Sequence, residues 1–172
     1  MYLELRPPVP ARDWRRLLVR LAGIESVLCL GPAAVTATVF LGCASPSVCS
    51  WLSPAVTLLV LTSSVLASYL AHELAHLAAL ARAPGVSTIR LAFAFHRLSV
   101  EARGSIPPQW RIVAAASGPL IGASVAGFLS VMFGQPVLGA VGLLHAAMLL
   151  PLFGDGRALV GAVRAWRSST PP

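Results

Sequence analysis

The sequence has no lysine and few charged side chains of any kind. Charged residues make up 11% of its 172 positions, whereas about a quarter of a soluble domain is charged. No Asp, Glu, Lys or Arg lies between residues 26 and 71, or between residues 112 and 154. These absences argue against an ordinary soluble domain and predict an integral membrane protein. The length of 172 residues is enough for one domain.

Each uncharged stretch is long enough for two membrane-spanning helices of about 20 residues and a turn. Proline and glycine positions predict spans at 24–43, 54–81, 111–133 and from 137 to the broken segment at 151–156. Between the second and third spans, Ile89, Leu91 and Phe93 alternate with other residues. This two-residue period is typical of strands and predicts a short hairpin that turns near residues 95–97. The expected fold is an all-α membrane protein with four transmembrane helices and a short cytoplasmic β-hairpin between the second and third.

The net charge of +7 comes from arginine alone, and the arginines gather beside the predicted spans. They lie at 6–20, 82–111 and 157–167, and none lies in the short loops near 45–53 and 134–136. The positive-inside rule then predicts that both termini and the central loop are cytoplasmic. We expect a basic segment at 1–23, a four-span core at 24–156, and a C-terminal helix and tail at 157–172. Nucleic-acid binding is disfavoured, because the arginines flank the spans.

Three cysteines add little to this interpretation. Cys43 and Cys49 flank the first predicted outer loop and could pair in an oxidising compartment, although apolar filling is the favoured interpretation. Cys29 falls inside the first predicted span, where packing is its simplest role.

The segment that predicts chemistry is His72-Glu73-Leu74-Ala75-His76. Histidines four residues apart project from one face of a helix and can bind one zinc ion. Glu73 follows the first histidine, where it can take a proton from a water molecule that the metal activates. Ionisable residues inside a membrane span cost about 2.5–3.5 kcal/mol and mark functional sites by default. The alternative is a polar cluster that only packs helices together through hydrogen bonds.

A zinc hydrolase also needs a third protein ligand and an open coordination position. Asp155 is the favoured third ligand, because it lies at the same predicted membrane side as the motif within a glycine-flanked break. His145 and His96 are the other candidates, and a continuous helix would place His145 roughly 15 Å deeper than Asp155. Asp155 could instead be an interfacial aspartate paired with Arg157.

These motifs resemble the site-2 protease family of intramembrane zinc metalloproteases over roughly residues 55–160. In that family, HExxH in one span and an Asp-Gly motif in a later span supply the zinc ligands, here His72, His76 and Asp155-Gly156. Ser117-Gly118-Pro119-Leu120 is similar to the family's Gly-Pro segment. The resemblance implies one Zn²⁺ ion, Glu73 as the catalytic residue, and cleavage of membrane-embedded protein or peptide substrates in regulated intramembrane proteolysis. The expected location is a bacterial plasma membrane.

Gly122 and Met148 occupy positions where the family often carries asparagine. This departure leaves open a catalytically silent membrane scaffold, and a metal-binding transport or sensor protein is a further alternative. The pair Gly118 and Gly122 predicts close packing of the third span against the second. The hairpin could accept a substrate by strand addition, or it could only close the cytoplasmic mouth of the site.

Overall fold

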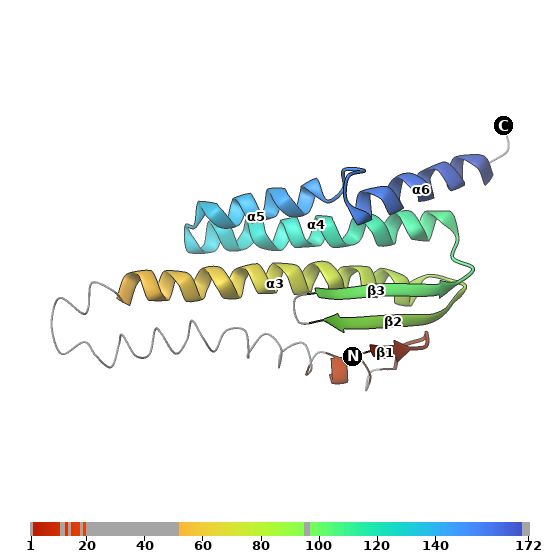
Figure 1. Cartoon of the computed structure of the whole chain (residues 1–172), viewed down its shortest axis with the longest axis horizontal. Coiled ribbons are helices and arrows are strands. Elements are labelled where there is room, and N and C mark those ends of the chain that lie inside the picture. The colour runs from red at the N-terminus through yellow and green to blue at the C-terminus, as the bar shows by residue number, and fades with distance from the viewer. Residues whose placement is uncertain are drawn as a thin grey trace.

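A computed structural model of the chain describes residues 2–10, 13, 15–17, 19, 52–94 and 97–169. This part is mostly helical and includes a small antiparallel sheet. Figure 1 shows the sheet beside the C-terminal half of α3 (Leu52–Arg82), with α4 (Pro108–Phe133) along the other side of that helix. The predicted first span at 24–43, the Cys43 and Cys49 loop, and His96 lie outside the described residues.

Two described helices, α3 and α4, are long and apolar enough to cross a membrane. Their most apolar stretches have mean hydropathies of 1.4 and 1.8. Large apolar side chains such as Leu120, Phe128 and Val131 are exposed on α4. These helices match the predicted second and third spans closely, and α4 begins after Pro107, with Pro108 in its first turn as helix starts favour.

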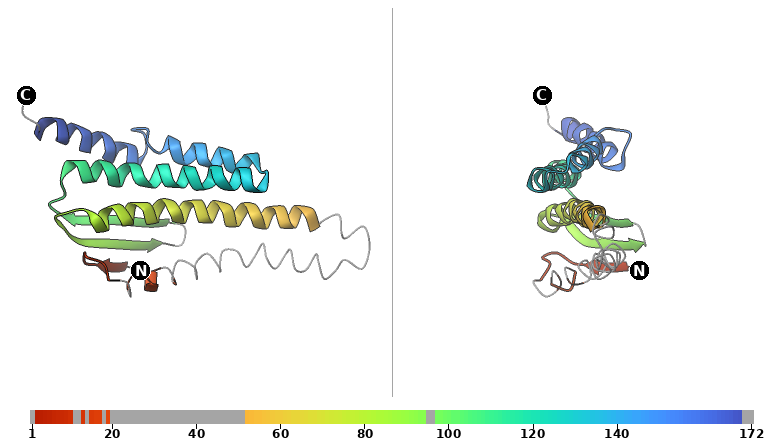
Figure 2. Two further views of the ribbon diagram at one scale, coloured as in Figure 1. Left: turned by 180° about the vertical axis from the view of Figure 1, so that it is seen from behind. Right: turned by 90° about the vertical axis from the view of Figure 1, so that its left-hand side faces the viewer.

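The predicted fourth span is not one helix. Helix α5 (Pro136–Ala147) has 12 residues, and α6 (Gly154–Ser169) begins after a run of turns at 148–153. At 1.5 Å per residue, α5 is about 18 Å long, well short of the roughly 30 Å hydrocarbon core of a bilayer. Figure 2 shows α5 and α6 following one another along α4. The sequence correctly predicted a break near Pro151, but α6 resumes directly at the glycines.

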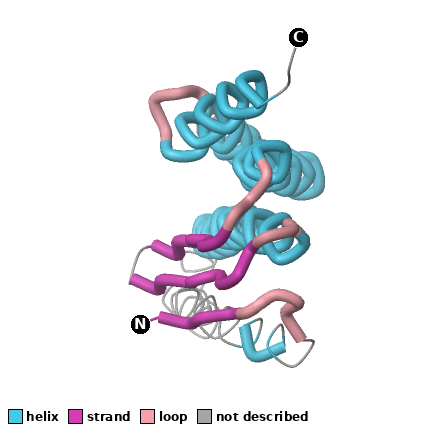
Figure 3. The backbone as a smooth tube through the Cα atoms, turned by 90° about the vertical axis from the view of Figure 1, so that its right-hand side faces the viewer, coloured by secondary structure: helices cyan, strands magenta, loops and turns pink. Residues whose placement is uncertain are grey.

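The predicted hairpin is present as β2 (Val86–Ala94) and β3 (Arg97–Gly104). The sheet also has a third strand, β1 (Tyr2–Leu5), which pairs antiparallel with β2. The sequence pattern did not predict this strand. The strand order β1-β2-β3 therefore makes β3 an edge strand within the described part of the chain. Figure 3 shows the three strands lying side by side, and β3 and β2 contact α3.

A hydrophobic core joins the sheet to α3. Ile89 and Leu91 of β2 are fully buried and belong to one cluster with Leu5 of β1 and Leu77 and Leu80 of α3. Burying a side chain of this size stabilises a fold by about 1.5–3 kcal/mol. The apolar residues whose alternation predicted the strand are thus the residues on its buried face. Their packing holds the hairpin, and with it β3, beside α3, the helix that carries His72 and His76.

Candidate metal centre

Three side chains from two helices converge on one point. His72 and His76 lie one turn apart on α3, and Asp155 lies in the first turn of α6. The His72 Nε2 and His76 Nε2 atoms are 3.1 Å apart. Carboxylate oxygens of Asp155 lie 3.3 Å from His72 Nε2 and 3.5 Å from His76 Nε2. The structure thus brings the three predicted ligands together, and this group could hold a metal ion.

The three separations fit a tetrahedral ion. Zinc binds histidine nitrogen and carboxylate oxygen at about 2.0–2.2 Å. Two ligands of a regular tetrahedron with that radius lie roughly 3.3–3.6 Å from each other. The observed 3.1, 3.3 and 3.5 Å are close to this value. Two imidazoles and one carboxylate are also a ligand set of catalytic zinc, with a fourth position left for water.

His76 is fixed by contacts with α4. Its Nδ1–H donates to the Ala114 carbonyl oxygen at 2.6 Å, so that Nε2 is the nitrogen that faces the group. An outer hydrogen bond of this kind orients a metal-binding histidine and selects its tautomer. A Cβ atom at Gly118 would lie only 2.3 Å from His76 Nε2, so a glycine is needed beside the ring. The predicted packing of Gly118 and Gly122 against the second span is therefore confirmed.

Asp155 is held by the turn that opens α6. The Gly156 N–H donates to the Met148 carbonyl at 3.0 Å, and a Cβ at Gly156 would overlap the Leu150 carbonyl. Arg157 donates to the Leu152 carbonyl oxygen at 3.3 Å, whereas Asp155 contacts the two histidines.

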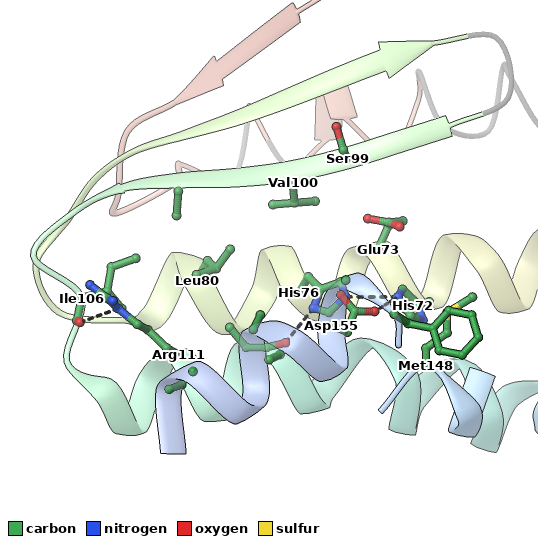
Figure 4. A pocket seen from close by; sticks show the side chains of 18 of the residues that line it. His72, Glu73, His76, Leu80, Ser99, Val100, Ile106, Arg111, Met148 and Asp155 are labelled. Atoms are coloured by element: carbon green, nitrogen blue, oxygen red, sulfur yellow. Dashed lines mark hydrogen bonds and ion pairs between the residues drawn. The ribbon is translucent and has the colours of Figure 1, made fainter. Parts of the chain in front are cut away.

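A cavity of about 1040 Å³ opens beside the three ligands. Glu73, the predicted catalytic residue, lines it and lies on the side of α3 that faces β3 (Figure 4). Ser99 and Val100 of β3 line the same cavity. The cavity is therefore lined by the three ligands, by Glu73 and by residues of β3.

His145 lies next to the ligands but is not one of them. Its ring centroid is 5.2 Å from that of His72, and its Nε2 is 3.3 Å from Ser68 Oγ. The expectation that His145 lies roughly 15 Å deeper than Asp155 assumed a continuous helix. The helix is instead interrupted by the turns at 148–153, which bring the Gly156 N–H back to the Met148 carbonyl. Both residues consequently contact His72.

Sequence reasoning also missed the contribution of Ser68. This serine is fully buried and precedes His72 by four residues, so both lie on the same face of α3. That spacing is the signal that could have identified it.

The chain matches no protein-family model, and no curated protein or solved structure matches it significantly.

Proposed function

We propose that the protein is an intramembrane zinc metalloprotease that hydrolyses peptide bonds of membrane-embedded substrates. The observation that carries the proposal is the His72, His76 and Asp155 group, whose separations suit tetrahedral zinc, with Glu73 lining the same cavity. This combination is what metal-assisted hydrolysis requires.

Zinc, when bound, would lower the pKa of a water molecule towards neutrality and polarise the substrate carbonyl. Glu73 has the chemistry of the general base, because a carboxylate next to the metal can accept a proton from the attacking water. It then donates that proton to the leaving amine, which closes the proton balance of the hydrolysis. Asp155 and the histidines hold the metal, and a separate carboxylate performs the proton transfer.

The substrate would reach the site as an extended segment along β3. Helical amides are hydrogen-bonded and shielded, so a membrane-embedded substrate must unwind locally before attack. An edge strand offers unpaired backbone groups to such a segment. Ser99 and Val100 place that edge at the cavity, which favours strand addition over a simple closing role for the hairpin.

Metal removal and restoration test this function. The purified protein in vesicles should cleave a single-span reporter, lose cleavage on treatment with a zinc chelator, and recover it when zinc is returned. A catalytically silent scaffold would bind zinc and cleave nothing in any of these states. Cleavage that continues after complete metal removal would contradict the proposal.

Metal transport is the second candidate, and one observation favours it. Ser64, Ser68, His72 and His76 follow one another at four-residue spacing, and the first three are buried. This polar line runs from the metal-binding group into the apolar helix. However, the Ser68 hydroxyl is already bonded to the Val65 carbonyl and near His145. A transporter should carry zinc across sealed vesicles, and a protease should not.

A further inference from the structure

Two buried nitrogen atoms beside the candidate metal centre have no hydrogen-bond partner among the described residues. They are Nδ1 of His72 and Nδ1 of His145. Both side chains are deeply buried, since His72 is 4% exposed and His145 is 5% exposed. A buried polar atom without a partner is costly, so such atoms in a native fold need a physical explanation.

The hydrogen bonds around Ser68 determine which proton His145 carries. The Ser68 hydroxyl donates its only proton to the Val65 carbonyl oxygen at 2.9 Å. Towards His145 it can therefore only accept. The His145 Nε2, 3.3 Å from Ser68 Oγ, must then be the N–H donor of that contact. In the neutral imidazole this leaves His145 Nδ1 as an acceptor with a free lone pair.

The opposite assignment holds for His72. Its Nε2 faces His76 and Asp155, so a metal ion would bind through that nitrogen. A neutral imidazole that binds metal through Nε2 carries its proton on Nδ1. The two unpartnered atoms are thus one donor, on His72, and one acceptor, on His145, in rings whose centroids are 5.2 Å apart.

We propose that His145 is a positioning residue for the metal site, whose Nδ1 accepts a hydrogen bond from His72 Nδ1–H through one bridging water. This inference rests on the proposed metal site and adds a residue to it. The resulting chain runs from the Val65 carbonyl through Ser68 and His145 to His72. It gives His72 what Ala114 gives His76, an acceptor that fixes both the tautomer and the ring orientation.

The packing of α4 supports this role. A Cβ atom at Gly122 would lie 2.9 Å from His145 Nδ1 and 3.1 Å from the His72 Cβ. The glycine therefore leaves room for the two rings to approach each other, as Gly118 does for His76.

Three variants of His145 separate this role from simple packing. His145→Asn keeps an acceptor oxygen at the δ position, facing His72, and loses the contact with Ser68. His145→Gln reaches the ε position near Ser68 but lacks the δ acceptor. His145→Leu lacks both. Loss of an outer-shell partner typically weakens metal affinity about 10–100-fold.

Zinc affinity of the full chain in detergent, measured by competition with a chromophoric chelator, should fall at least tenfold in His145→Leu and His145→Gln. His145→Asn should recover most of that loss. The visible spectrum of the Co²⁺-substituted protein depends on ligand geometry and not on cleavage. It should differ from that of the wild type more in His145→Leu and His145→Gln than in His145→Asn. Thermal unfolding of the metal-free variants checks that each one folds.

Ser68→Ala is the second test, because it leaves the imidazole in place and removes only the group that selects its tautomer. It should weaken zinc binding less than His145→Leu does. Equal zinc affinity in wild type and His145→Leu would overturn the proposed hydrogen bond, as would recovery by His145→Gln instead of His145→Asn. If the wild type itself binds no zinc, the metal site and the proposed function fail first, and the role of His145 fails with them.

Discussion

Replacement of Gly118 by alanine should disable the metal site without unfolding the protein. The added Cβ would lie 2.3, 2.5 and 2.7 Å from three atoms of the His76 ring. Non-bonded carbon atoms settle at about 3.5–4.0 Å, so the ring must move by roughly 1 Å. The 2.6 Å hydrogen bond from His76 Nδ1 to the Ala114 carbonyl resists that movement.

The size of the effect follows from the cost of overpacking. Inserting a methyl group into a filled site costs about 1–3 kcal/mol. If this cost falls on the metal-binding geometry, zinc affinity decreases by a factor of about 5 to 150. Alanine also favours a helix over glycine by about 1 kcal/mol, which offsets part of the cost in the free energy of unfolding.

Gly127→Ala is the matched control. Gly127 lies on the same helix and its added Cβ would meet nothing within 4 Å. Both variants gain the same helix propensity, so the difference in their zinc affinities isolates the contact with His76. Affinity is measured by chelator competition, with circular dichroism and thermal unfolding of the metal-free proteins alongside. If Gly118→Ala binds zinc as tightly as Gly127→Ala, the arrangement of α3 against α4 described above is wrong.

Three further outcomes are expected. Asp155→Asn should weaken zinc binding and abolish cleavage, because the amide cannot supply the anionic ligand, and zinc titration checks the first effect; unchanged affinity would exclude Asp155 as a ligand. Proline placed in the substrate segment that pairs with β3 should block cleavage at alternate positions, as scored by reporter fragments, since it removes an N–H from the ladder; uniform tolerance would argue against strand addition. A topology reporter inserted at Gly134–Pro136 should be located outside the cytoplasm, and a cytoplasmic location would reverse the predicted orientation.

Local periodicity was enough to predict the helices and strands that carry the motif. The four-residue spacing of His72 and His76 and the alternation around Ile89 depend on neighbouring residues along one element. Helices α3 and α4 and the hairpin accordingly lie close to their predicted bounds. The grouping of Asp155 with the histidines followed from the chemistry of zinc, which narrows the third ligand to few side chains.

Features that depend on contacts distant in sequence were not predictable in this way. The strand β1 has only four residues, too few for a period to be read, and its partner β2 lies about 85 residues later. The turns at 148–153 interrupt the helix and bring the Gly156 N–H back to the Met148 carbonyl, which hydropathy does not register. Consequently His145 was placed too far from the site, although the structure puts it against His72.

The most direct measurement compares wild type with Glu73→Gln in vesicles that contain a single-span reporter, with zinc content determined on the same samples. The two proteins should contain equal zinc, because Glu73 is outside the metal-binding group. The variant should cleave about 10²–10⁴-fold more slowly, because it lacks the group that transfers the proton. Equal cleavage by the two zinc-loaded proteins would contradict the proposed protease.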